Sequence, residues 1–110
     1  MTILSRSEEM YMVAIWELED EAYGVAIRRR VTEKTGKMIS YGALYIALDQ
    51  LLKKGYVDKI PGEPTAKRGG RKKFFYTLTD PGIEVLKRTY AHQKALWTGV
   101  SGLIGESGGQ

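Results

Sequence analysis

The sequence lacks cysteine altogether and has only three prolines and one histidine among its 110 residues. Without cysteine the chain has no disulfide bond, no thiolate metal ligand and no thiol nucleophile. The lone histidine, His92, has no second histidine to share a metal ion with. We therefore expect neither a metal site nor a cofactor.

Long apolar runs are also missing. No stretch approaches the roughly 18 apolar residues of a membrane-spanning helix, and residues 1–9 lack the apolar segment of a signal peptide. Motifs of catalytic sites are missing too. The Gly69-Gly70 pair, for example, is not surrounded by the other residues of a phosphate-binding loop. The sequence predicts a cytoplasmic protein with no membrane partner, and not an enzyme.

What the sequence does have is a segregated charge. Its net charge is +4. Residues 1–21 hold six acids and one base, whereas residues 59–73 hold six bases and one acid. The prolines and glycines of the basic segment favour a loop. A basic loop of this kind indicates a nucleic-acid partner.

Helical signals fill the first half of the chain. The spacing of Ser5 and Glu8 is typical of a capping box and predicts a helix over residues 6–19. An apolar stripe predicts a second helix over residues 23–35. Ser40 is a good N-cap, so a third helix is expected to run from there to Lys54.

The second half reads as a hairpin followed by one more helix. Two β-rich runs, 56–60 and 73–78, flank the basic segment and predict a hairpin with a long basic tip. A cap at Thr79 or Asp80 predicts a last helix over residues 81–104, and we expect residues 105–110 to form a disordered tail.

The last helix carries a seam of residues spaced by three and four, the pattern of a helix that packs against another helix. The seam comprises Ile83, Leu86, Tyr90, Gln93, Trp97, Val100 and Ile104. Gln93 interrupts it, and Gly99 and Gly102 disfavour helix near its end. We expect four of its members to form a dimer interface: Ile83, Leu86, Tyr90 and Trp97.

This order of elements is that of a winged helix-turn-helix protein. The predicted fold is mainly α with a β-hairpin wing: a DNA-binding domain over residues 4–80 and a C-terminal dimerisation helix over residues 81–104. In such proteins the second helix of the motif, here residues 40–54, enters the major groove.

The expected outward face of this recognition helix is mostly small or able to hydrogen-bond. It comprises Ser40, Tyr41, Gly42, Ala43 and Gln50. The polar members can bond phosphates or base edges, and the small ones allow close approach. Ile46, also outward, either contacts a thymine methyl group or is a single exposed apolar residue of no special role.

The bases of the hairpin tip are the candidate phosphate contacts: Lys67, Arg68, Arg71, Lys72 and Lys73. Arg68 or Arg71 can also enter the minor groove. The alternative is a solvated loop that keeps the protein soluble. The run of arginines at 28–30 has two interpretations as well, contact with the DNA backbone or a salt-bridged surface.

Several runs together resemble the PadR family of bacterial and archaeal regulators over about residues 4–90. They are the Tyr23-Gly24 pair, the run Ala43-Leu44-Tyr45 with Leu48, and residues 68–82 ending in Leu78-Thr79-Asp80-Pro81-Gly82. The resemblance implies a homodimeric repressor on a pseudo-palindromic operator. It places Ser40, Tyr41, Gly42, Tyr45 and Ile46 at the DNA-facing start of the recognition helix, and Lys67, Arg68 and Arg71 at the wing tip.

Some members of that family release DNA on binding phenolic acids or flat hydrophobic drugs, the drugs by stacking on a tryptophan of the C-terminal helix. Trp97 is the counterpart here, and Trp16 of the first helix faces either the same cleft or the core. The alternative for Trp97 is packing in the dimer interface. A small hydrophobic or aromatic effector is thus one expected partner, besides double-stranded DNA and a second copy of the chain.

The sequence therefore predicts a sequence-specific DNA-binding repressor. The alternative is a winged-helix protein-interaction module without specific DNA readout. In that case Asp49 and the acidic amino-terminal segment would serve as the partner surface.

Overall fold

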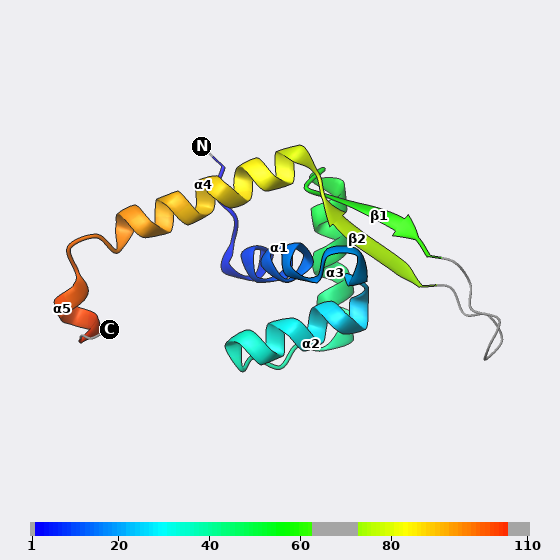
Figure 1. Ribbon diagram of the computed structural model, residues 1–110, viewed down its shortest axis with the longest axis horizontal. Coiled ribbons are helices and arrows are strands. Elements are labelled where there is room, and N and C mark those ends of the chain that lie inside the picture. Colours follow the sequence, from blue (N-terminus) through cyan, green and yellow to red (C-terminus); the bar gives the residue numbers. More distant parts are fainter. Residues whose placement is uncertain (1, 63–72, 106–110) are drawn as a thin grey trace.

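The protein is described here from a computed structural model, over residues 2–62 and 73–105. Most of this part of the chain is helical, with one antiparallel hairpin (Figure 1). The elements are α1 (Arg6–Leu18), the 3-10 turn η1 (Glu19–Glu21), α2 (Gly24–Thr35), α3 (Tyr41–Lys53), β1 (Val57–Pro61), β2 (Phe74–Leu78), α4 (Asp80–Leu96) and α5 (Ser101–Ile104). The predicted winged helix-turn-helix fold is confirmed.

Helix α1 begins and ends for local reasons. The Glu8 amide donates to the Ser5 hydroxyl at 3.2 Å and the Ser5 amide donates to the Glu8 carboxylate at 2.8 Å, which confirms the capping box. The helix stops at Leu18 because Glu19 has φ +54°, a positive value with which an α-helix cannot continue. Helix α2 ends as predicted at Thr35, and Gly36 follows in the left-handed conformation with φ +74°.

The core forms where α1 crosses the other helices and β2. Met12 and Ile15 of α1 are fully buried against Ile27 of α2 and the leucine stripe of α3. That stripe, Leu44, Leu48 and Leu51, has no exposed surface at all, as its spacing predicted.

The hairpin pairs Val57 with Leu78 at its base and Pro61 with Phe74 at its far end. It is also tied to the start of α2. The Tyr76 amide donates to the Ala22 carbonyl at 2.8 Å, and Tyr23 bridges to Phe75. Tyr23 is therefore extended rather than helical, and α2 begins one residue later than we predicted.

A tight joint leads from the hairpin into α4. The Thr79 hydroxyl accepts from the Gly82 amide at 3.1 Å and donates to the Gly55 carbonyl at 2.6 Å. A Cβ atom at Gly82 would lie 2.0 Å from the Tyr56 carbonyl oxygen, so no side chain fits there. The start of α4 is thus fixed against the end of α3 and β1.

Beyond this joint α4 extends away from the winged domain (Figure 1). The expected single helix over 81–104 is wrong in its last part. Helix α4 ends at Leu96, the chain turns at Gly99 with φ +87°, and the short α5 follows. Val100 and Ile104 therefore do not continue the seam of α4. The predicted tail beyond Gly105 lies outside the described residues.

Candidate nucleic-acid interface

Helix α3 presents the outward face that the sequence predicted. Its N-cap, Ser40, accepts from the Ala43 amide at 3.0 Å. The residues at the start and along the outer face of this helix that were predicted to face DNA are exposed: Ser40, Tyr41, Gly42, Ala43, Tyr45, Ile46 and Gln50. Ile46 is 66% exposed, on the face away from the buried leucines. This face of α3 is accessible to DNA. The contacts with DNA themselves stay a prediction.

Tyr45 has a second role in the fold. A Cβ atom at Gly24 would lie 2.1 Å from the Tyr45 hydroxyl oxygen, so the tyrosine ring packs over the first turn of α2. Burial, and then the nearby Tyr45 and Asp49, raise the pKa of the Tyr76 hydroxyl on β2. Tyr45 thus packs α3 against α2, a contact that sequence reasoning did not predict.

The turn between α2 and α3 is held by Arg28. Its Nε donates to the Ile39 carbonyl, and its guanidinium carbon lies 4.4 Å from the centroid of the Tyr41 ring. Such a cation–π contact contributes about 0.5–1 kcal/mol at an exposed site. Arg28 therefore positions the first residue of the recognition helix.

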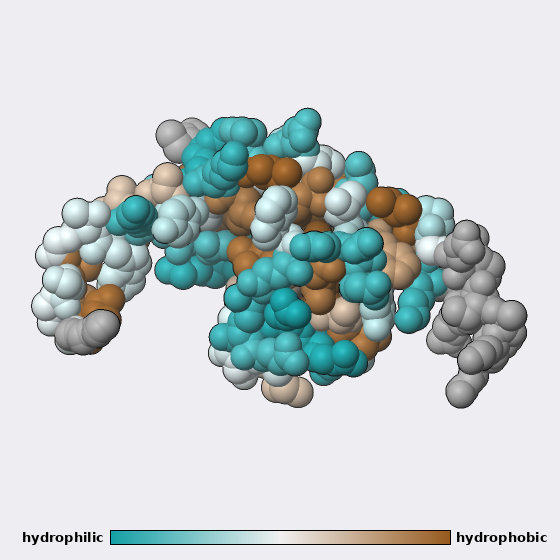
Figure 2. Space-filling view, viewed as in Figure 1, coloured by the Kyte–Doolittle hydropathy of each residue, from teal (hydrophilic) through white to brown (hydrophobic). Residues whose placement is uncertain are grey.

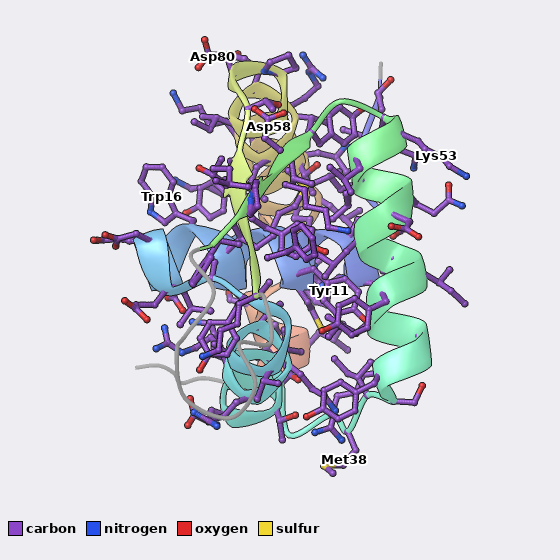
Figure 3. All side chains as sticks on the ribbon, turned by 90° about the vertical axis from the view of Figure 1, so that its right-hand side faces the viewer. Tyr11, Trp16, Met38, Lys53, Asp58 and Asp80 are labelled. Carbon is purple, nitrogen blue, oxygen red and sulfur yellow. The ribbon has the colours of Figure 1, made fainter. Side chains whose placement is uncertain are left out.

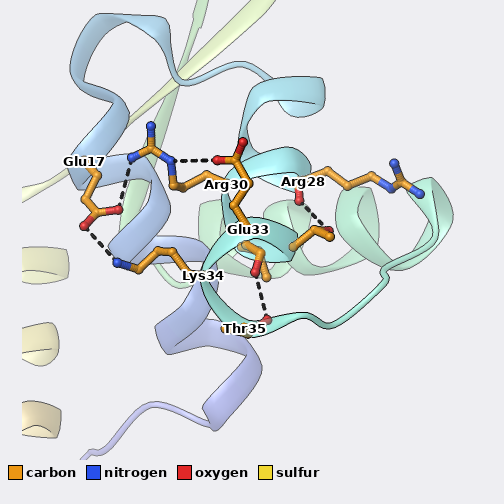
Figure 4. Close-up of polar contacts among 8 residues, drawn as sticks. Glu17, Arg28, Arg30, Glu33, Lys34 and Thr35 are labelled. Carbon is orange, nitrogen blue, oxygen red and sulfur yellow. Dashed lines mark hydrogen bonds and ion pairs between the residues drawn. The ribbon is translucent and has the colours of Figure 1, made fainter.

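The two other arginines of this run differ from each other. Arg30 pairs with Glu17 of α1 at 3.1 Å and with Glu33 at 3.5 Å (Figure 4). Lys34 donates to the other oxygen of Glu17 at 3.0 Å, and the hydrogen bonds from Lys34 and then Arg30 lower the pKa of Glu17. Arg29 is exposed and forms no ion pair with an acid among the described residues. The salt-bridged interpretation holds for Arg30, and Arg29 is the free cation.

Toward the far end of the hairpin, two lysines lie over aromatic rings. Lys73 Nζ is 4.1 Å from the centroid of Tyr23, and Lys59 Nζ is 4.4 Å from that of Phe74. The predicted tip residues Lys67, Arg68, Arg71 and Lys72 lie outside the described residues. Neither pairing could be predicted from the sequence, and that of Lys73 with Tyr23 joins residues far apart in the chain.

A different surface lies across the molecule from α3. Figure 3 shows Trp16 on one side and α3, marked by Lys53, on the other. Trp16 is 62% exposed. It lines an open groove of about 340 Å³ between α1 and α4, where Figure 2 shows exposed apolar side chains. The lining residues are Glu9, Val13, Trp16, Leu78, Ile83, Leu86, Lys87 and Tyr90.

The groove unites three of the four predicted dimer residues, Ile83, Leu86 and Tyr90, with Trp16. Trp97 is not among its lining residues and lies at the end of α4, 43% exposed. Sequence reasoning missed Val13, although it precedes Trp16 by three residues and so shares its helix face. The Gln93 side chain, which interrupts the apolar seam of α4, is bonded within the chain. Its Nε2 donates to the Glu9 carboxylate at 2.6 Å.

Within residues 2–62 and 73–105 there is no cluster of three metal-ligating side chains. The same ranges contain no helix long and apolar enough to cross a membrane.

Comparison with known proteins agrees with this geometry. The PadR-like family of transcriptional regulators matches residues 12–88, from α1 into α4. No curated protein matches the chain in sequence. RosR of H. salinarum is a similar structure, with 26% identity and a TM-score of 0.65, over 87% of this chain and 79% of that one.

Two clostridial structures share the fold. A transcriptional regulator from Clostridium thermocellum has 22% identity and a TM-score of 0.69, over 89% of this chain and 92% of that one. A PadR family regulator from Clostridium difficile has 19% identity and a TM-score of 0.67, over 89% and 98%. Because the family match covers most of the winged domain and the first half of α4, the chain belongs to the PadR-like family and is a DNA-binding transcriptional regulator, not an enzyme.

Proposed function

We propose that the protein is a homodimeric repressor that binds a pseudo-palindromic operator in the cytoplasm. The observation that carries this proposal is the separation of its two exposed surfaces. The groove beside Trp16 is apolar and open, whereas α3 lies on the other side of the molecule (Figure 3). A second copy seated on the groove would leave both recognition helices uncovered.

The groove has the character of an interface. Trp16 is 62% and Tyr90 is 64% exposed, and both lie beside the half-buried Ile83 and Leu86. Contiguous exposed apolar surface of this kind marks interaction sites in soluble proteins, and aromatic residues dominate the energetics of such interfaces. The second copy is the partner that a symmetric operator requires.

On the DNA side we assign two kinds of contact. Ile46 and Gln50 are the residues proposed to read base edges, together with the exposed start of α3. Arg29, the hairpin lysines Lys59 and Lys73, and the tip residues Lys67, Arg68, Arg71 and Lys72 are proposed to contact phosphates.

The test is to select genomic fragments with the purified protein and to footprint the selected fragments at two salt concentrations. We expect a protected inverted repeat with half-sites about one helical turn, roughly 34–36 Å, apart. Ile46→Ala should lower affinity for this operator and leave affinity for random DNA unchanged, whereas Ile46→Val keeps the branched side chain as the control. Arg68→Ala and Arg71→Ala should weaken both kinds of DNA alike.

Equal losses on operator and random DNA for Ile46→Ala would remove Ile46 from the base-reading face. An absence of DNA binding at low salt would contradict the whole proposal and favour the protein-interaction module. A reporter gene placed behind the footprinted site, derepressed when the regulator is deleted, would distinguish repression from activation.

We also propose that a small hydrophobic or aromatic effector binds beside Trp16, between the two copies. Of the two tryptophans predicted as ligand residues, only Trp16 lines the groove. Quenching of tryptophan fluorescence by a planar dye should therefore be lost in Trp16→Phe and kept in Trp97→Phe. The reverse pattern would move the effector to the end of α4.

A further inference from the structure

Helix α4 is attached to the rest of the protomer over a short distance only. Its buried residues are Gly82, Val85 and Thr89. After Thr89 every residue of α4 is exposed except Gln93. The direction in which α4 extends from the winged domain therefore depends on few contacts.

Hydrogen bonds join the amino-terminal segment and α1 to the part of α4 where its buried residues end. The buried Leu4 amide donates to the Thr89 hydroxyl at 3.0 Å, and that hydroxyl donates to the Val85 carbonyl at 2.8 Å. Gln93 Nε2 donates to the Glu9 carboxylate of α1 at 2.6 Å, and Arg88 donates to the Thr2 carbonyl at 3.3 Å. Together these bonds form a latch between the start of the chain and the middle of α4.

The latch is directional in a way that apolar packing is not. Hydrogen bonds weaken steeply as their angle departs from linear. Thr89 has no exposed surface and uses its hydroxyl both as acceptor and as donor. A valine would match its shape and leave the buried Leu4 amide without a partner.

We propose that this latch fixes the angle between α4 and the winged domain, and thereby the distance between the two recognition helices of the dimer. The inference rests on the proposed function, because it requires a dimer that pairs through α4. Thr89 and Gln93 are then positioning residues that select the spacing of operator half-sites without contacting DNA. Successive base pairs are about 3.4 Å apart, so a small change of angle at α4 shifts the register of one recognition helix by a whole base pair.

The experiment measures affinity for a series of operators in which the half-site separation varies one base pair at a time. The full-length variants are Thr89→Val, which loses both hydroxyl bonds, and Gln93→Ala, which loses the bond to Glu9. Thr89→Ser keeps the hydroxyl and should behave like the wild type. His92→Ala, next to Gln93 and exposed, is the matched control. Affinity for a single half-site and the dimer dissociation constant are measured alongside.

We expect the wild type to have a sharp optimum of spacing. In Thr89→Val and Gln93→Ala the optimum should broaden or move, with about tenfold weaker binding at the wild-type spacing, because the two half-sites are no longer engaged together. Half-site affinity and dimerisation should stay within about twofold of wild type, since the surfaces themselves are unchanged. Gln93→Ala, at a partly exposed position, keeps the test decisive if Thr89→Val does not fold.

Two results would overturn the inference, and they can be told apart. A dimeric wild type with a spacing optimum that Gln93→Ala shares unchanged would overturn the latch alone. A monomeric wild type, or one indifferent to spacing, would overturn the proposed dimeric repressor and the latch with it.

Discussion

The winged domain and the C-terminal arm, α4 with α5, both contain apolar residues at helical spacing. These residues are buried in the domain and exposed in the arm. In the winged domain the leucine stripe of α3 is fully buried, and α1 and β1 are among the elements that pack against this helix. In the arm Leu96 is 63%, Leu103 79% and Ile104 69% exposed. The domain closes its own core, whereas the arm leaves these apolar side chains exposed. Spacing along a helix thus identifies an apolar face without identifying what covers it.

The largest expected difference between the domain and the arm is the loss of stability when one apolar side chain is truncated. Leu48→Ala in α3 should lower the free energy of unfolding by about 2–5 kcal/mol, because it leaves a cavity in a closed core. Leu103→Ala in the arm should change it by less than about 0.5 kcal/mol. Urea unfolding at low protein concentration measures both. Similar losses for the two variants would mean that the arm is as well packed as the domain.

The second largest expected effect is on the association of two copies of the chain. Leu86→Glu should raise the dimer dissociation constant by about 30-fold or more, because it places a charge in the apolar groove at a cost of at least about 2 kcal/mol. Sedimentation velocity over a dilution series measures this constant. Glu84→Ala, exposed on the same helix, is the control. A Leu86→Glu protein that dimerises like the wild type would place the interface elsewhere.

A third, smaller effect is the pH dependence of the domain. Glu8 is partly buried, which opposes its charge, but the hydrogen bonds from Lys54 and from the Ser5 amide outweigh this and lower the pKa of Glu8. The stabilisation is fully present above the pKa of the unfolded chain and is lost as the pH falls through the lower pKa of the folded protein. Glu8→Gln should therefore cost about 1 kcal/mol near neutral pH, comparable to the loss of a helix cap, and less in acid. Thermal unfolding from pH 7 to pH 3 checks this, and parallel curves for both proteins would contradict it.

The smallest effect separates two neighbouring arginines. Arg29→Ala should weaken binding to any DNA a few-fold and reduce the slope of log affinity against log salt by about one, as the loss of one phosphate contact does. Arg30→Ala removes a cation already paired with Glu17 and Glu33, so its salt slope should stay closer to wild type. Fluorescence anisotropy on random DNA measures both slopes. Identical slopes for the two variants would show that pairing does not decide which arginine binds DNA.

Features set by neighbouring residues could be predicted from the sequence. The capping box of Ser5 and Glu8, the caps at Ser40 and Thr79, and the leucine stripe of α3 depend on residues within a few positions of one another. The end of α4 was harder, because the apolar spacing continued through residues where Gly99 turns the chain.

Contacts between distant residues could not be predicted in this way. The bridge from Tyr23 to Phe75 and the cation–π pair of Lys73 with Tyr23 join residues about fifty positions apart, and only the packed fold brings them together. The same holds for Gln93, which looked like a flaw in an apolar seam and is bonded to Glu9. The exposed face of α3 could be predicted because it is the complement of a buried stripe on one helix.

The joint at Gly82 has a consequence for how such regulators diversify. The backbone of α4 meets the Tyr56 carbonyl so closely that its starting point is set by the winged domain alone. Val85 and Thr89 are still buried after the joint, so only the part of the arm past Gln93, whose side chain is bonded to α1, can be lengthened, shortened or exchanged without repacking the part that binds DNA. The H. salinarum structure, of which this chain spans 79%, illustrates that a similar fold occurs in a longer protein. The end of the arm is thus a replaceable module, and it can change without altering the recognition helix.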